Sequence, residues 1–204
     1  MMLRTKIMKI VVITLVLMMP ASLFAHDHPS PSAKADAVRP GTSLYNVTTQ
    51  WTAEDGHHVT LADFEGRPVV ITMAYTSCKD ICPLIVANMM RIEDEALILG
   101  AHEVTFLFVS LDPARDTPDQ LKAYATRYGL DLTRWSLLQG DAKSVRLLAA
   151  ALGIRFRWVD KTTIDHSTVI TLLDSSGRVI MQTGTDQIDH EKLVERLVTL
   201  SQQR

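Results

Sequence analysis

The chain holds two cysteines, Cys78 and Cys82, with three residues between them. They follow the apolar run Pro68–Ala74, and a helical pattern starts at Leu84, so the pair is predicted to lie in a turn at an exposed helix start. A helix N-terminus stabilises a thiolate through its partial positive charge. Spacing four apart puts both sulfurs on one helical face, close enough to bind one metal ion or to close a disulfide. A purely structural disulfide is a third possibility, but it would close a short loop and stabilise the fold little.

The elements around this pair follow an α/β order. Pro68–Ala74 and Val104–Leu111 are nearly continuous apolar runs, typical of parallel strands buried on both faces. Helices are predicted over Leu84–Leu99, Thr117–Tyr128, Asp141–Leu152 and Ile188–Leu200, and strand pairs over Leu44–Trp51 with Val59–Leu61 and over Thr168–Leu173 with Val179–Gln182. This order predicts a thioredoxin-like α/β sandwich with an N-terminal β-hairpin extension.

The N-terminus indicates export from the cytoplasm. Arg4, Lys6 and Lys9 precede the apolar stretch Ile10–Met19, and a plausible processing site ends at Ala25. The stretch is shorter than the roughly 20 residues of a membrane-spanning helix, which favours cleavage over a permanent anchor. A periplasmic protein is therefore expected, and an uncleaved inner-membrane anchor facing the periplasm is the alternative.

The remaining chain is expected to form a tether and one domain. Residues 26–41 are rich in Pro, Ser and Ala and are predicted to be a flexible tether, followed by a single domain over residues 42–204. Without residues 1–25, 18 Lys and Arg oppose 23 Asp and Glu, a formal net charge of −5. This acidic balance argues against a nucleic-acid partner, and a membrane contact is expected only if the N-terminal segment stays uncleaved.

Three motifs occur in a specific order along the domain. They are Tyr75-Thr76-Ser77-Cys78-Lys79-Asp80-Ile81-Cys82-Pro83, Val109-Ser110-Leu111-Asp112-Pro113-Ala114-Arg115-Asp116-Thr117, and Ile164-Asp165-His166-Ser167. Together they resemble the Sco/SenC family of copper proteins that serve cytochrome c oxidase assembly. The resemblance implies that Cys78, Cys82 and His166 bind one copper ion.

The chemistry of these three side chains agrees with copper. Two thiolates and an imidazole suit Cu(I), and the imidazole also makes Cu(II) tolerable. A structural zinc site would need four protein ligands, and no convincing fourth is present in the sequence. In a thioredoxin-type sheet, the loop entering Thr168–Leu173 faces the cysteine turn, which favours His166 as a ligand over an ordinary polar residue at a strand start.

The expected function is that of a copper metallochaperone rather than an enzyme. The family implies a copper-receiving respiratory oxidase subunit as partner, with another copper chaperone or a thiol reductase as further partners. The alternative is a dedicated periplasmic thiol–disulfide oxidoreductase that keeps a copper-site protein reduced through Cys78 and Cys82, which would form a disulfide when metal-free and oxidised. The three-residue spacing and the lack of any proline after Pro118 favour metal binding, since thioredoxin-type oxidoreductases place a cis-proline opposite their cysteines.

Several neighbouring residues are weaker candidates for supporting the site or docking a partner. Lys79 stands where the family usually has proline, and its charge favours a thiolate. Asp165 either orients His166 or caps a turn. These candidates are Lys79, Asp80, Asp112, Arg115 and Asp165, and Asp116 is a further one because, like Asp112 and Arg115, it follows a buried strand.

Overall fold

The structure is a computed structural model that describes residues 41–184 and 189–203. The predicted export signal (1–25), the tether up to residue 40 and Ile188 lie outside the described residues. Within the described ranges, no helix is both long enough and apolar enough to cross a membrane.

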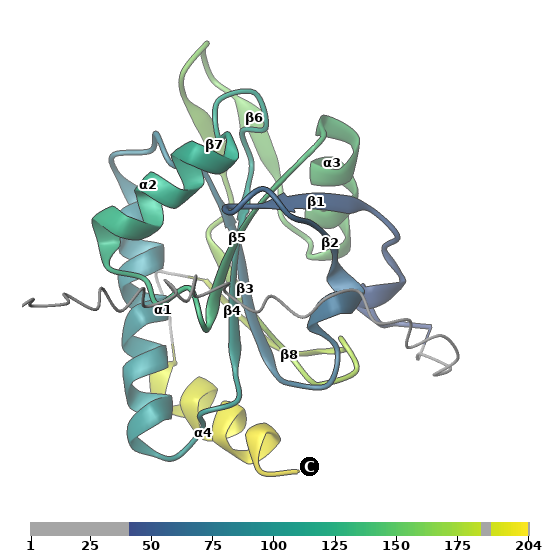
Figure 1. The fold of residues 1–204 in the computed structure, drawn as a ribbon, viewed down its shortest axis with the longest axis vertical. Coiled ribbons are helices and arrows are strands. Elements are labelled where there is room, and N and C mark those ends of the chain that lie inside the picture. The colour runs from purple at the N-terminus through teal and green to yellow at the C-terminus, as the bar shows by residue number, and fades with distance from the viewer. Residues whose placement is uncertain (1–40, 185–188, 204) are drawn as a thin grey trace, which may run out of the picture.

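A mixed sheet, seven-stranded within the described residues, forms the centre of the molecule (Figure 1). Its strands in spatial order are β2 (His58–Thr60), β1 (Gln50–Ala53), β5 (Trp135–Gly140), β4 (Thr105–Ser110), β3 (Val69–Ala74), β8 (Val169–Leu173) and β9 (Val179–Gly184). Strands β3, β4 and β5 run parallel, and the other neighbours pair antiparallel. Every residue of β3 and β4 is buried, which explains their nearly continuous apolar sequences.

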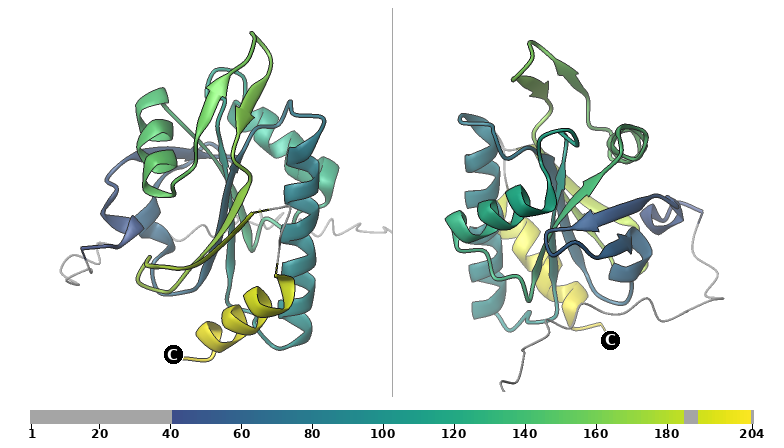
Figure 2. Two further views of the ribbon diagram at one scale, coloured as in Figure 1. Left: turned by 180° about the vertical axis from the view of Figure 1, so that it is seen from behind. Right: turned by 45° about the horizontal axis from the view of Figure 1, so that its top comes forward.

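Helices cover both faces of this sheet. α1 (Ile81–Ile98), α2 (Pro118–Tyr128) and α4 (His190–Ser201) lie on one face, and α3 (Ala142–Ala151) lies on the other (Figures 1 and 2). The chain steps from β3 to β4 to β5 in one direction, so two right-handed crossovers place α1 and α2 on the same side. The α/β sandwich of the thioredoxin type is thereby confirmed, and the antiparallel pair β1–β2 extends the sheet beyond β5 as the N-terminal hairpin.

Local signals set the helix ends close to where the sequence predicts them. The Thr117 side chain accepts a hydrogen bond from the backbone N–H of Gln120, and Asp141 accepts one from Ser144 in the same way. Both are N-caps, which satisfy N–H groups that have no partner within the helix. Gly153 follows α3 with a φ of 67°, a left-handed conformation that glycine adopts without a Cβ clash.

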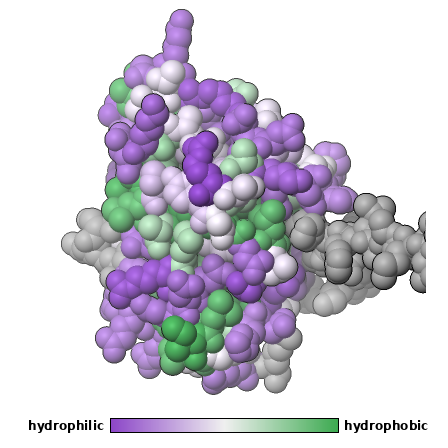
Figure 3. Space-filling model, turned by 60° about the vertical axis from the view of Figure 1, so that its left-hand side comes forward, coloured by the Kyte–Doolittle hydropathy of each residue, from purple (hydrophilic) through white to green (hydrophobic). Residues whose placement is uncertain are grey.

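The face formed by α1, α2 and α4 is largely hydrophilic, with separate hydrophobic areas (Figure 3). The exposed apolar residues of α1 lie at its two ends: Ile81 and Leu84 at the start, and Ile98 at the end. Those at the start are close in sequence to the cysteines.

The structure differs from the sequence prediction in four elements. Leu44–Asn46 forms a 3-10 helix, η1, instead of part of a strand, because the Ser43 side chain accepts a hydrogen bond from the Tyr45 N–H and starts a turn. A second 3-10 helix, η2, spans Leu61–Phe64. Strand β5 was not predicted, and α1 begins at Ile81 rather than Leu84.

An additional hairpin lies outside the central sheet. β6 (Phe156–Trp158) and β7 (Ile164–His166) pair only with each other among the described strands. Figure 2 shows this hairpin projecting past the end of the sheet near which α1 begins. It carries His166, so its position decides where the imidazole lies.

Candidate metal centre

The two cysteines occupy different environments in the turn between β3 and α1. Cys78 lies in the loop before the helix, where its N–H donates to the carbonyl of Tyr75 (3.4 Å), and it is half-buried. Cys82 lies in the first turn of α1 and is fully buried against the core. Both thiols are free. The pair lies at the start of the helix as predicted, but the predicted exposure is wrong for Cys82, because the helix begins at Ile81 and its first turn faces Cys82 toward the core. The two cysteines also do not share a helical face, since Cys78 precedes the helix.

His166 meets Cys82 across 84 positions of sequence. The imidazole Nε2 lies 3.4 Å from the Sγ of Cys82. The other ring nitrogen, Nδ1, lies 3.1 Å from the carbonyl oxygen of Ser167, which can only accept a hydrogen bond. Nδ1 therefore carries the proton, and Nε2 directs its lone pair toward the sulfur. This is the tautomer that a metal ligand requires at Nε2.

The electrostatic environment separates the acidities of the two thiols. Burial opposes ionisation of Cys78, but hydrogen bonds offered to its sulfur outweigh burial and hold the pKa of Cys78 below its ordinary value. The donors are the thiol and the backbone N–H of Cys82, the backbone N–H of Asp80 and the hydroxyl of Tyr75. Burial raises the pKa of Cys82, and the neighbouring charge of Cys78 raises it further. Cys78 is thus the more acidic thiol of the pair.

Burial also lowers the pKa of His166, although the Ser167 carbonyl and the charge of Asp165 act in the opposite direction. The imidazole is therefore neutral over a wider pH range than an exposed histidine. Asp165 does not hydrogen-bond the ring: its carboxylate pairs with Arg157 at 3.0 Å on the exposed face of the hairpin. Asp165 acts on His166 only through the electrostatic effect of its charge, which raises the pKa of the imidazole.

The donor set fits a soft metal ion. Metal–sulfur and metal–nitrogen bonds are about 2.3 and 2.0 Å long, so one ion can reach both atoms across the 3.4 Å between Cys82 and His166. Among the described residues, no three His, Cys, Asp or Glu side chains already surround one point. Cys78 is the adjacent third donor, held in a loop rather than in the helix.

A buried carboxylate forms hydrogen bonds with the turn that carries the cysteines. Asp116, fully buried after β4, accepts hydrogen bonds from the Thr76 backbone N–H (3.1 Å), the Thr76 hydroxyl (2.5 Å) and the Ser110 hydroxyl (2.6 Å). Burial raises the pKa of Asp116 despite these hydrogen bonds. Its place after a buried strand, which it shares with Asp112 and Arg115, is the sequence signal that points to Asp116.

Tyr75 was not singled out by sequence, yet it contacts both halves of the site. Its hydroxyl accepts the N–H of Ile164 on the hairpin (3.3 Å), and its ring lies edge-on to the imidazole of His166, with 6.0 Å between ring centroids. It ends the apolar run before the cysteines, where an aromatic residue looks like an ordinary core position.

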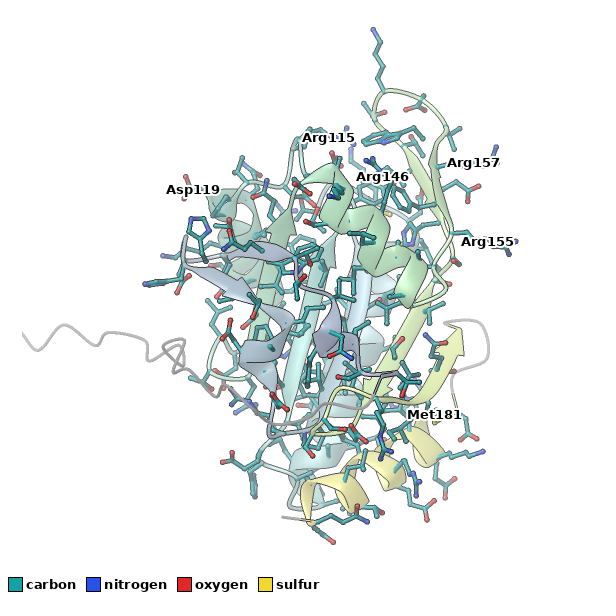
Figure 4. The ribbon with its side chains drawn as sticks, turned by 90° about the vertical axis from the view of Figure 1, so that its right-hand side faces the viewer. Arg115, Asp119, Arg146, Arg155, Arg157 and Met181 are labelled. Atoms are coloured by element: carbon teal, nitrogen blue, oxygen red, sulfur yellow. The ribbon has the colours of Figure 1, made fainter. Side chains whose placement is uncertain are left out.

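The other candidates lie around the site at different depths. Lys79 and Asp80 are exposed in the cysteine turn. Asp112 is fully buried and forms an ion pair with Arg115, whose guanidinium reaches the hairpin. Figure 4 shows Arg115 at the same end of the molecule as Arg155 and Arg157, which point outward from the hairpin.

The family model described as SCO1/SenC matches residues 41–202 of this chain. The SCO1 protein homolog of Bacillus subtilis is 32% identical over 91 residues, which cover 45% of this chain and 47% of the relative. The chain matches about half the length of the first curated relatives that it resembles.

Solved structures share the fold. The structure of Bradyrhizobium japonicum ScoI with copper bound has a TM-score of 0.60 and 26% identity, over 74% of this chain and 96% of that one. BsSco, described as a member of the Sco family of cytochrome c oxidase assembly proteins with a disulfide switch, has a TM-score of 0.69 and 21% identity, over 83% of this chain and 98% of that one. At the latter identity the likeness concerns the fold alone.

Proposed function

Because the chain belongs to the SCO1/SenC family, we propose that it binds one copper ion through Cys78, Cys82 and His166. Its role is then to deliver copper to, or mature, the copper site of a respiratory oxidase. The dinuclear copper site of cytochrome c oxidase subunit II is the specific client we propose. The copper-bound ScoI of Bradyrhizobium japonicum supports copper binding, and membership of the SCO1/SenC family supports a role in oxidase assembly.

The observation that carries the proposal is the contact between Cys82 and His166. A sulfur and an imidazole nitrogen from distant segments lie 3.4 Å apart, with the nitrogen in the tautomer that leaves its lone pair free. Thiolate ligands hold Cu(I), and the imidazole extends the site to Cu(II). Cys78, the more acidic thiol, receives a hydrogen bond from the Cys82 thiol and supplies the second sulfur beside it.

The test is an anaerobic copper titration of the reduced protein, followed by absorbance and native mass spectrometry. We expect one copper per chain, and an intense sulfur-to-copper charge-transfer band for Cu(II). His166→Ala should fold normally, retain Cu(I) on two thiolates and bind Cu(II) at least about tenfold more weakly, a change of about 1.4 kcal/mol.

His58→Ala is the matched control, because His58 is an exposed histidine on β2 that contacts Thr52 and no cysteine. It should bind both copper ions as the unaltered protein does. If Cys78→Ser and the unaltered protein give the same Cu(II) spectrum, the proposed site is wrong. A drop of many degrees in the Tm of metal-free His166→Ala would instead make His166 a structural residue.

The surroundings of the site are suited to a protein partner. Ile81 and Leu84 at the start of α1 and Trp158 on the hairpin are exposed apolar residues at the same end of the molecule. Aromatic and aliphatic side chains beside a reactive site are common anchors of protein interfaces. We propose that the oxidase subunit docks here, with the protein located outside the cytoplasm.

A second candidate is a thiol–disulfide oxidoreductase dedicated to the same client, and the unequal acidity of the two thiols favours it. The Cys78 thiolate would attack a client disulfide and form a mixed disulfide, and the released client thiolate would take up a proton. Cys82 would then lose its proton, attack the Cys78 sulfur and release the second client thiol. Two electrons pass to the client, and Cys78–Cys82 is left as a disulfide. Substoichiometric copper binding together with rapid turnover of disulfide substrates would favour this function over copper delivery.

A further inference from the structure

The hairpin that carries His166 is attached to the rest of the molecule by side-chain and loop contacts rather than by strand pairing. β6 and β7 form a two-stranded sheet that shares no ladder with the central sheet in the described chain. An isolated two-stranded hairpin is marginally stable in water. The position of His166 therefore depends on contacts outside its own strand pair.

Arg115 makes three such contacts at the tip of the hairpin. Its guanidinium donates from Nη2 to the carbonyl of Thr162 (3.0 Å) and from Nη1 to the carbonyl of Lys161 (3.4 Å). Its Cζ lies 5.2 Å from the centre of the Trp158 ring, within the range of a cation–π interaction. The guanidinium of Arg115 thus contacts two carbonyl oxygens of the tip loop and the ring of Trp158, the last residue of β6.

Asp112 holds Arg115 in place. The Nε of Arg115 donates to Oδ2 of Asp112, whose carboxylate is fully buried, while Oδ1 of Asp112 has no hydrogen-bond partner in the described structure. A buried carboxylate with one free oxygen depends strongly on its single cationic partner. Arg115 is consequently fixed at its Nε and presents its two Nη groups to the hairpin.

The tip that Arg115 holds is itself well ordered. Asp160 Oδ1 accepts hydrogen bonds from the backbone N–H groups of Thr162 and Thr163 (2.6 and 2.8 Å). These hydrogen bonds lie within the loop that connects β6 and β7 and fix its backbone conformation. They do not connect it to the body of the molecule, whereas Arg115 does.

We propose that Arg115 is a positioning residue that ties the hairpin to the loop after β4 and thereby keeps Nε2 of His166 beside Cys82. The hairpin is otherwise joined to the body by the Ile164–Tyr75 hydrogen bond and the buried Ile164 side chain, and at its base by the His166–Cys82 contact. Arg115 adds an attachment at the tip loop, beyond these contacts, and so restricts movement of the hairpin away from the body. The effect of Arg115 on copper binding rests on the proposed function, but its role in holding the hairpin does not.

The decisive variant is Arg115→Lys. Lysine keeps a cation beside Asp112, which avoids a bare buried charge, but it lacks the planar fork that reaches two carbonyls. Arg155→Lys is the matched control, because Arg155 begins the same hairpin and its side chain makes no hydrogen bond or ion pair with the described residues.

Amide hydrogen exchange of the metal-free protein reports on the hairpin directly. In Arg115→Lys, we expect the hydrogen-bonded amides of Val159 and Ser167 to exchange at least about tenfold faster than in the unaltered protein, with β4 amides unchanged. Arg155→Lys should stay within about twofold. Hairpin exchange that is unchanged in Arg115→Lys overturns the proposal, and so does equal acceleration in β4, which would make Arg115 a determinant of global stability.

The rate of copper release tests whether Arg115 affects metal binding by His166. Arg115→Lys should release Cu(II) to a chelator about tenfold faster than either the unaltered protein or Arg155→Lys. The reason is that a looser hairpin lets the His166 imidazole dissociate from the metal more often. A looser hairpin with unchanged Cu(II) release would overturn the positioning role. If the unaltered protein binds no copper, the proposed function fails, and the exchange measurement still decides whether Arg115 holds the hairpin.

Discussion

Cys78 and Cys82 differ in exposure and in acidity, although only three residues separate them. Cys78 is half-buried and receives hydrogen bonds at its sulfur, whereas Cys82 is enclosed by the core and contacts His166. A thiolate is both the metal ligand and the nucleophile. Copper capture and thiol exchange would therefore both begin at Cys78 and be completed by Cys82.

This difference predicts selective alkylation. A lowered pKa leaves more thiolate at any pH below the ordinary thiol value of about 8.5, so iodoacetamide should modify Cys78 in the folded protein at pH 6–7 while Cys82 stays unmodified. Bound copper should protect both sulfurs. Timed alkylation followed by peptide mass spectrometry measures this, and unfolding in urea should make the two rates equal. Equal rates in the folded protein would contradict the assignment of Cys78 as the more acidic thiol.

At the scale of elements, the loop between β4 and α2 connects the two halves of the site. Asp116 reaches back to Thr76 in the cysteine turn, and Arg115 reaches across to the hairpin that bears His166. Two side chains that are neighbours in sequence thus hold two segments that are distant in sequence. The loop itself is fixed by the buried carboxylates at its two ends, Asp112 and Asp116.

Removing the Asp116 carboxylate should loosen the cysteine turn. Asp116→Ala leaves the Thr76 N–H and two hydroxyl groups without their acceptor, which should lower the free energy of unfolding by about 3 kcal/mol. It should also make Cys82 accessible to alkylation. Asp119→Ala is the control, because Asp119 is an exposed carboxylate in the first turn of α2, and it should change stability by less than about 0.5 kcal/mol. Urea denaturation and alkylation rates provide the two measurements, and a Cys82 that remains protected would argue against this role.

At the scale of the whole molecule, the site depends on how α1 is joined to the sheet. Glu93, buried on α1, accepts hydrogen bonds from the indole N–H of Trp135 (2.6 Å) and from Nε of Arg134 (2.7 Å). These bonds join the helix to the start of β5, far along the helix from the cysteines. They stabilise the layer that carries Cys82 without touching the site.

Glu93→Ala should therefore affect stability and leave the site chemistry unchanged. We expect a loss of about 2–3 kcal/mol in the free energy of unfolding, because a buried indole N–H and a guanidinium lose their acceptor. Glu95→Ala, which removes a surface i,i+4 pair with Arg91 on the same helix, should cost less than about 1 kcal/mol. Chemical denaturation measures both. A changed Cys78 alkylation rate in folded Glu93→Ala would show that the site and this layer are coupled.

Much of this arrangement follows from local sequence. The buried strands β3 and β4 are evident from their apolar runs, and Thr117 and Asp141 mark helix starts because a side-chain oxygen must satisfy the free N–H groups there. The chemical types of the donors are also local information: two thiols four positions apart and an imidazole just before a strand. These features determine which metal the chain suits and at which end of the sheet its cysteines lie.

Only the tertiary structure decided which of these groups meet and in what state. β5 escaped prediction because Ser136 and Gln139 interrupt its apolar pattern, and β6 because its exposed residues show no alternation that a buried face would impose. The contact of His166 with Cys82, the unequal acidity of the thiols and the hold of Arg115 on the hairpin all depend on through-space distances between segments far apart in the chain. Burial and hydrogen bonding are properties of that packing, and no local pattern encodes them.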